Sequence, residues 1–462
     1  MMRPLPETTM ETPGTRGFLS DVVWNSVVIG LSWPLTVAIA VVVGRVLGPS
    51  GKGDYTLAAT VATLLATLLT SGIPGAISYF LGGGRLPADR LVKTLVLLAA
   101  GLGAACLGLA WALDRTGWCR WVIGLRYLTP IIWLAVAGLP FQFVGTFLQF
   151  VTLAQGRRLL FALLPAVGQM LLAGLIVLLL AGGRLTPLTA MGAAVASQVL
   201  MGVVQLWQQQ VQVHWCGASP LDRAQLGNMV RFSALTHVGN LLHFLVQRAD
   251  VFLVMTLLGA REVGLYSVAY GMGELLLLLP QRLGVLYLPR VAAANRGQDQ
   301  ASEVRLSCSL VCLGSVAAAV VMAVAGGPVI RLLYGPAFAP AASPLLALLP
   351  GTVALSLASL MAAYLSGTGR VATTMRAAGI GLAINLPLNL VWIPRFGMVG
   401  AALASSVAYS AQALVLLWSV ARSINTPLPA MFSAASRPQL LALWRRLRPP
   451  AMAQTAVGRN GE

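Results

Sequence analysis

Charged side chains are scarce in this 462-residue sequence. They make up only 10 % of it, against 57 % hydrophobic residues and a mean hydropathy of +0.81. A soluble domain carries roughly 25 % charged residues, so too few polar groups are present to cover a water-facing globule of this size. Most of the apolar blocks instead reach the ~20 residues that cross a bilayer as a helix. The alternating ~10-residue segments of a membrane β-barrel are not seen.

Acidic residues are the scarcer charged group, with 13 Asp and Glu against 31 Lys and Arg, for a net charge of +18. The basic residues are spread along the connecting loops rather than gathered in one soluble module, so we expect no nucleic-acid partner. Arg and Lys accumulate in the cytoplasmic loops of membrane proteins. With the N-terminus inside, 20 basic residues fall on the cytoplasmic side and 9 on the external side. This imbalance predicts that both termini are cytoplasmic.

Catalytic and metal-binding motifs are also missing. Gly51 and Lys52 are followed by Gly53 rather than Ser or Thr, so there is no Walker A motif and ATP hydrolysis is not expected. The five cysteines have no CxxC spacing, and the three histidines form no ligand cluster. We predict a protein that is not an enzyme, with no catalytic residue, metal or cofactor. A membrane glycosyltransferase or polymerase is a weaker alternative, because such enzymes usually need a large external loop and the loops here are short.

The apolar blocks predict an all-α polytopic membrane protein with about twelve transmembrane helices. The expected ranges are 21–43, 55–81, 91–113, 130–153, 159–180, 187–207, 231–257, 265–288, 304–325, 344–365, 371–392 and 397–420. An even number of spans places the two ends of the chain on the same side of the membrane.

Four short patterns recur at offsets of about 211 residues, which indicates an internal repeat. The repeated pairs are 48–58 and 259–269, 156–157 and 369–370, 192–197 and 400–405, and 206–207 and 417–418. Six spans per repeat put the two copies in parallel orientation. The repeat therefore predicts two homologous six-helix bundles, residues 1–211 and 212–422, followed by a basic cytoplasmic tail at 423–462. Two such bundles around a central cleft form a transporter layout.

Several ordered stretches carry a family resemblance that covers most of residues 20–420. They are Arg45–Tyr55, Arg248–Asp250, Val263–Ala269, Leu288–Arg290, Tyr334–Phe338, Gly367–Arg370 and Ile393–Gly397. In this order and spacing they resemble Wzx-type polysaccharide flippases, which belong to the multidrug/oligosaccharidyl-lipid/polysaccharide exporter superfamily. Peptidoglycan-precursor flippases of that superfamily usually carry fourteen helices, and this tail has no room for two more.

The resemblance implies a V-shaped bundle in the cytoplasmic (inner) membrane that alternates access between its two sides. It also implies a substrate, undecaprenyl-diphosphate-linked oligosaccharide, carried to the outer leaflet for cell-surface polysaccharide export. Membrane lipid, and polysaccharide polymerase and chain-length proteins, are the partners it suggests. Drug exporters of the superfamily share the twelve-helix plan, so an ion-coupled multidrug exporter of the same fold is the main alternative.

Ionisable residues deep in apolar segments are costly, which makes them candidates for substrate binding. Arg248 and Glu274 each lie 13 residues from the turn near Arg261, which is ~20 Å along an antiparallel helix pair. They are expected at equal depth, where they either pair structurally or take part in transport. Asp250 points about 200° away from Arg248, so we expect that the two cannot both face the second helix of the pair. One of them then faces the cleft or another helix. Arg282 lies further along the second helix, where it either contacts an anionic substrate or lies near enough to the cytoplasmic surface to snorkel.

Polar side chains at helical spacing supply further candidates. Thr60, Thr63 and Thr67 share one helix face, where they either line a hydrated cavity or bond back to their own helix. Asn385 and Asn389, four residues apart, either bind a sugar or cation or make a contact between helices. The ionisable residues have no counterparts in the first half, which predicts that ionic chemistry is concentrated in the second.

Overall fold

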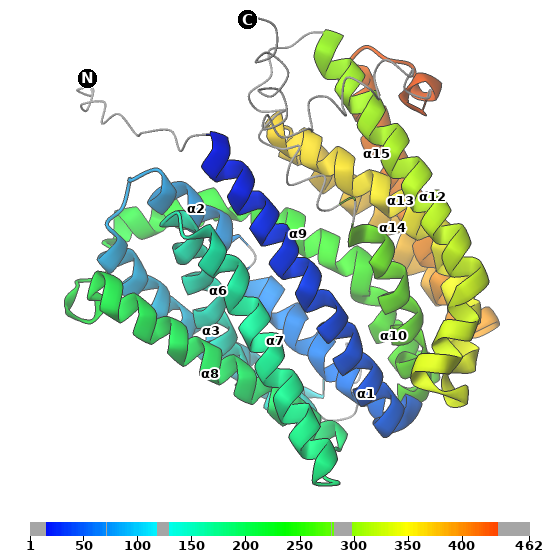
Figure 1. The fold of residues 1–462 in the computed structure, drawn as a ribbon, viewed down its shortest axis with the longest axis horizontal. Helices are drawn as coiled ribbons and strands as arrows, with labels where there is room; N and C mark the ends of the chain where they lie inside the picture. The colour runs from blue at the N-terminus through cyan, green and yellow to red at the C-terminus, as the bar shows by residue number, and fades with distance from the viewer. Residues whose placement is uncertain (1–14, 71, 118–128, 279, 281–297, 433–462) are drawn as a thin grey trace, which may run out of the picture.

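The computed structural model describes residues 15–70, 72–117, 129–278, 280 and 298–432, and within these ranges the chain is helical without a β-strand. Figure 1 shows the helices packed side by side in one bundle, in which α1 begins and α15 ends at the same end. The expectation of an all-α polytopic fold is confirmed.

The helices follow the predicted segments closely. Those of the first half are α1 (Thr15–Thr70), α2 (Ile73–Gly82), α3 (Ala88–Thr116), α5 (Pro130–Ala137), α6 (Leu139–Ala154), α7 (Arg158–Ala181) and α8 (Pro187–Val213). Those of the second half are α9 (Arg223–Leu258), α10 (Ala260–Glu274), α12 (Gln298–Tyr334), α13 (Ala342–Gly367), α14 (Val371–Phe396) and α15 (Met398–Ser423). Short 3₁₀ turns occupy Trp215–Gly217, Leu275–Leu277, Pro336–Ala341 and Leu428–Phe432.

Ten helices in the described part of the chain are long and apolar enough to cross a membrane. One of them, Trp33–Thr70, holds two predicted segments on either side of Gly48, where the helical backbone is broken. The predicted eighth segment corresponds to α10 and the 3₁₀ turn after it, and its last residues lie outside the described part. Each of the twelve predicted segments therefore has a helical counterpart.

Two predicted helices are interrupted. The segment at 55–81 is divided between the end of α1 and the separate helix α2, and the segment at 130–153 is divided between α5 and α6. The second division falls at Gly138, just before Pro140. Proline lacks the N–H that an unbroken helix needs at that position, so the two short helices replace one straight span.

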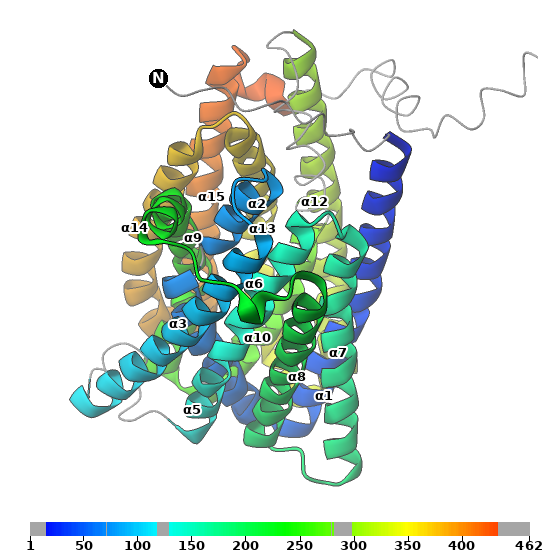
Figure 2. The same ribbon diagram turned by 90° about the vertical axis from the view of Figure 1, so that its left-hand side faces the viewer.

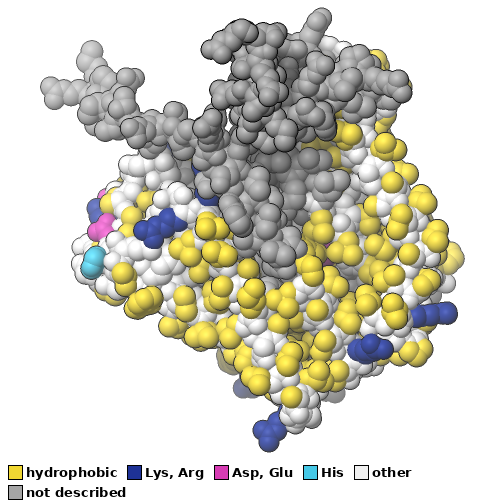
Figure 3. All heavy atoms as spheres, in the orientation of Figure 1, with side chains coloured by type: hydrophobic (Ala, Val, Ile, Leu, Met, Phe, Trp, Pro, Cys, Tyr) yellow, Lys and Arg dark blue, Asp and Glu magenta, His cyan; other side chains and the backbone are white. Residues whose placement is uncertain are grey.

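The outer face of the bundle is apolar, as a lipid-facing surface requires. Val324 on α12 is 76 % exposed, and other large apolar side chains with similar exposure are Leu178, Trp207, Leu313 and Leu332. Figure 3 shows hydrophobic side chains spread over most of the visible face, with basic side chains toward its margins. A surface of this kind would aggregate in water, so the protein is a multi-pass membrane protein.

Buried apolar side chains form several clusters, and the cluster of the first half also includes Met229 and Phe252 of α9. One cluster joins α1, α2, α3, α5 and α6, and two others lie among α9, α10 and α12 to α15. The beginning of α9 belongs with the first half, because Phe232 stacks on Tyr79 of α2 at 4.5 Å between ring centroids. Figure 2 shows α2 and α9 near one another in the turned view. The division of the chain at residue 211 therefore stays a proposal.

The two copies of the repeated glycine pattern pack directly against each other. A Cβ atom on Gly53 would overlap the carbonyl oxygen of Ala260, and one on Gly264 would overlap the carbonyl oxygen of Pro49. Pro49 and Ala260 are themselves equivalent positions of the repeat, so the contact is reciprocal. The backbones of α1 and α10 therefore touch where any side chain would force them apart.

We predict that Gly53→Ala destabilises the protein by about 1–3 kcal/mol, the usual range for overpacking, and lowers its thermal unfolding midpoint in detergent. Gly108→Ala on α3 is the matched control, because a Cβ there meets no atom within 4 Å, and it is expected to be neutral or slightly stabilising. Equal midpoints for the two variants would contradict the close contact.

Candidate functional site

Arg248 and Glu274 form an ion pair between α9 and α10. The Arg248 Nη2 atom lies 3.2 Å from Glu274 Oε1, and the two side chains are 30 % and 33 % exposed. The guanidinium also lies over the Tyr270 ring, 4.1 Å from its centroid. The expected approach of Arg248 and Glu274 at equal depth is confirmed. Tyr270 holds the guanidinium plane from one side by a cation–π contact.

Asp250 is fully buried and, like Arg248, contacts α10, so the expectation that the two could not both face this helix is wrong. Its carboxylate accepts hydrogen bonds from the Tyr266 hydroxyl of α10, from Ser405 Oγ of α15 at 3.0 Å, and from the backbone N–H of Val251 at 2.8 Å. Of the alternatives that the sequence left open, Asp250 therefore faces neighbouring helices. Its charge is held by three donors, as a buried carboxylate requires.

Asn385 and Asn389 continue this network into α14. Asn385 Nδ2 donates to Ser405 Oγ at 3.3 Å, and Asn389 Nδ2 donates to the side-chain oxygen of Asn385 at 2.9 Å. Both amides are fully buried. The network thus joins α9, α10, α14 and α15, which corresponds to the contact between helices that was one of the two expectations for these asparagines.

Tyr266 and Ser405, the residues that complete the network, were missed in the sequence analysis. Both lie inside repeated patterns, since Tyr266 matches Tyr55 and Ser405 ends the stretch that matches 192–197. That repetition was the available signal. It marked the positions as structurally important without indicating that they would surround Asp250.

The threonines of α1 bond to their own helix. Thr60 Oγ1 donates to the carbonyl oxygen of Thr56 at 2.7 Å, and Thr63 Oγ1 donates to that of Ala59 at 2.8 Å. Thr60 is buried, Thr63 exposed and Thr67 half-buried. The structure does not join them to the Asp250 network. Arg282, the remaining candidate, lies outside the described residues.

An open apolar crevice lies at the surface between α1 and the second half of the chain. It has a volume of about 590 Å³ and lies between α1 and the segment that follows Glu274. Its lining is apolar and includes Trp33, Val37, Leu275, Leu278 and Leu333. No group of three or more His, Cys, Asp or Glu side chains that could hold a metal ion occurs in the described ranges.

The fold matches solved membrane transporters. The lipid II flippase MurJ in an inward closed conformation aligns with a TM-score of 0.72 over 92 % of each chain, at 14 % identity. An inward-facing multidrug resistance MATE family transporter of the MOP superfamily aligns with a TM-score of 0.70, over 87 % of this chain and 96 % of that chain, also at 14 % identity. The fold is therefore that of MOP-superfamily transporters.

Comparison of the sequence with family models assigns the protein to a family, which is narrower than the assignment of its fold. A family model described as "Polysaccharide biosynthesis protein" matches residues 42–343, and the chain belongs to this family. A comparison with curated protein sequences gave no match. The expected resemblance to polysaccharide exporters of the superfamily is confirmed.

We predict that Asp250→Ala destabilises the protein by several kcal/mol, because it leaves the buried Tyr266 and Ser405 hydroxyls without an acceptor at ~1–3 kcal/mol each. Asp250→Asn keeps one acceptor oxygen and should lose less. Thermal unfolding in detergent is the measurement, and Asp89→Ala, at the start of α3 and far from the network, is the control. Similar unfolding midpoints for Asp250→Ala and Asp89→Ala would show that the network contributes little.

Proposed function

We propose that this protein flips undecaprenyl-diphosphate-linked oligosaccharide across the cytoplasmic membrane by alternating access, for cell-surface polysaccharide export. The observation that carries the proposal is Arg248, which lies inside an apolar helix bundle, is about one-third exposed, and contacts one Glu274 oxygen and the Tyr270 ring. Membership in a polysaccharide biosynthesis family and the MOP-superfamily fold support it.

The chemistry of the substrate explains why an arginine is needed. A diphosphate crossing a low-dielectric core requires compensating positive charge. Arginine stays ionised and offers five N–H donors in a fork that fits phosphate oxygens. The pair with Glu274 uses one of these donors, so the others are available to a phosphate. Arg282 is proposed as the second anion contact.

The hydrogen bonds of Asp250 help to decide which acidic residue balances the positive charge of Arg248. Tyr266, Ser405 and Val251 donate to the Asp250 carboxylate, which leaves Glu274 as the acidic partner of Arg248 across the hairpin. We infer that an incoming diphosphate competes with Glu274 for the guanidinium. Glu274 would then act as the resting counter-ion, and Asp250, Asn385 and Asn389 would set the position of α9.

A cationic-drug exporter is the second candidate function. It would need an acidic group in the cleft that is not already paired. In the described part of the helix core, Glu274 is paired with Arg248 and Asp250 is sealed by hydroxyl donors. These contacts favour an anionic substrate over a cationic one.

The proposed orientation places both termini in the cytoplasm. Under it, the apolar prenyl chain stays in lipid while the polar glycan crosses between the halves of the bundle. Polysaccharide polymerase and chain-length proteins are the proposed partners on the pathway that receives the glycan. Residues 1–211 and 212–422 are proposed as the two lobes, with 423–462 as a cytoplasmic tail.

Reporter fusions test this orientation. Fusions at Asn228 and Glu462 are expected to give cytoplasmic activity, because the basic residues are more numerous on that side. A third fusion near Arg184, in the α7–α8 turn, should give external activity and serves as the control. An external signal at Glu462 would refute the proposed topology.

Replacement of Arg248 tests the anion-binding role. Arg248→Ala should reduce the amount of lipid-linked glycan that reaches the outer leaflet by roughly 10- to 100-fold, the effect of losing a hydrogen bond from a charged group. Arg248→Lys should retain part of the activity, since it keeps the charge but not the fork. Arg282→Ala and Arg282→Lys are expected to behave in the same way, and protein level is measured in every case.

Exchanging the charges of Arg248 and Glu274 distinguishes a role in substrate binding from a purely structural role of the ion pair. The double variant Arg248→Glu, Glu274→Arg rebuilds an ion pair across the same two helices. We expect it to restore protein level without restoring export, because the guanidinium is then displaced to α10. Full export from this variant, or from well-expressed Ala variants at both Arg248 and Arg282, would exclude the proposed anion contacts.

A further inference from the structure

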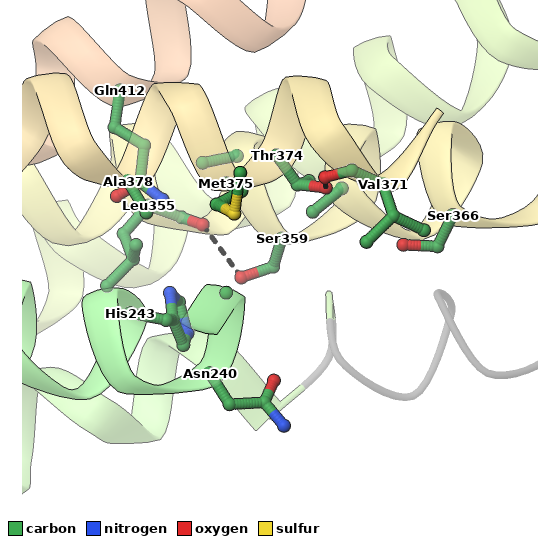
Figure 4. Close-up of a pocket in the computed structure, with 13 residues that line it drawn as sticks. Asn240, His243, Leu355, Ser359, Ser366, Val371, Thr374, Met375, Ala378 and Gln412 are labelled. Atoms are coloured by element: carbon green, nitrogen blue, oxygen red, sulfur yellow. Dashed lines mark hydrogen bonds between the residues drawn. The ribbon is translucent and has the colours of Figure 1, made fainter. Parts of the chain in front are cut away.

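A second cavity lies within the second half of the chain, away from the ion pair. It has a volume of about 320 Å³ and is enclosed by α9, α13, α14 and α15 (Figure 4). Its polar lining residues are Asn240, His243, Ser359, Ser366, Thr374 and Gln412. This volume is at the lower end of the roughly 300–1,000 Å³ found for small-molecule sites.

Gln412 lies at the buried end of this cavity. Its side chain is 96 % enclosed, since only 4 % of the residue is exposed, and its Oε1 atom has no hydrogen-bond partner. In Figure 4 it extends from α15 toward Asn240 and His243 of α9. An unpaired buried amide oxygen is costly. The Oε1 atom exposes less than 1 Å², so a donor on a ligand would pair with it once the Gln412 amide turns toward the cavity.

The other lining groups restrict the chemistry of that ligand. Ser359 and Thr374 donate their hydroxyl protons to the backbone oxygens of Leu355 and Val371, at 2.9 and 2.7 Å. Since these protons are already used, the two hydroxyl oxygens are left to accept hydrogen bonds from a ligand. Among the described residues, no Asp, Glu, Lys or Arg lines the cavity, and Leu355, Met375 and Ala378 supply apolar surface. These features fit an uncharged molecule that has several hydroxyl donors and apolar C–H faces.

We propose that this cavity binds one neutral sugar unit of the transported glycan. The inference rests on the proposed function, which it extends from the diphosphate to the saccharide. His243 precedes Arg248 by five residues on α9, a distance of ~7–8 Å along the helix. Five residues also turn the helix by about 140° beyond one full turn, so His243 and Arg248 point to different sides of α9 and would contact separate parts of one lipid-linked head group.

Binding of free sugars tests the cavity without requiring transport. The full-length protein in lipid nanodiscs is mixed with glucose, galactose, mannose and N-acetylglucosamine in turn, and binding is followed by saturation-transfer NMR. We expect at least one of these sugars to bind, with an affinity roughly 3- to 10-fold weaker in Gln412→Leu, the effect of one neutral hydrogen bond. Ala362→Phe, which fills the cavity without removing a polar group, should abolish binding.

Gln205→Leu is the matched control. Gln205 is also buried with an unpartnered Oε1 atom, but it lies on α8, outside this cavity, and its replacement should leave sugar binding unchanged. Failure of all four sugars to bind, or equal binding by the wild type and Ala362→Phe, would overturn the inference. A protein that exports lipid-linked glycan but binds no sugar refutes this inference alone. One that binds sugar in the cavity but exports no glycan refutes the proposed function alone.

Discussion

The close approach of two backbones at Gly53 and Gly264 constrains the rest of the molecule. Because neither residue has a side chain, α1 and α10 touch along their main chains. Tyr266, Tyr270 and Glu274 follow Gly264 on the same helix, so the contact that joins the halves also places the groups that surround Arg248 and Asp250. A shift of α10 would move the ion pair and the buried network together.

Asp250 and Glu274, two of the acidic residues of the α9–α10 hairpin, have different surroundings. Asp250 is sealed among hydroxyl and backbone donors that tie four helices together. Glu274 is about one-third exposed and contacts a partly exposed arginine. Exposed pairs contribute little to stability, whereas a buried carboxylate that loses its donors is costly. The contacts of Asp250 therefore stabilise the packing of four helices, whereas the ion pair between Arg248 and Glu274 can be broken at little cost in stability.

Much of this architecture could be predicted from the sequence, because it depends on local patterns. Apolar blocks of membrane-spanning length predicted the helices. The equal distances of Arg248 and Glu274 from the turn near Arg261 predicted that these two residues pair. The partners of Asp250 could not be predicted in this way, since Ser405 is 155 residues away and reaches it only through the packing of α15. The same holds for the cavity at Gln412, which exists only where four helices fail to fill the space between them. The break at Gly138 was missed because hydropathy does not register a proline inside an apolar block.

The reciprocity of the glycine contact has a consequence for the origin of the chain. Gly53 meets Ala260 as Gly264 meets Pro49, so one surface patch is used twice about a twofold axis. This is the geometry of an isologous interface, which a symmetric homodimer forms between identical subunits. A single six-helix ancestor with this patch would already have carried both sides of the junction. The positions equivalent to Arg248, Asp250 and Glu274 in the first half are Val37, Ile39 and Thr63, so the symmetry of the contact does not extend to these charges.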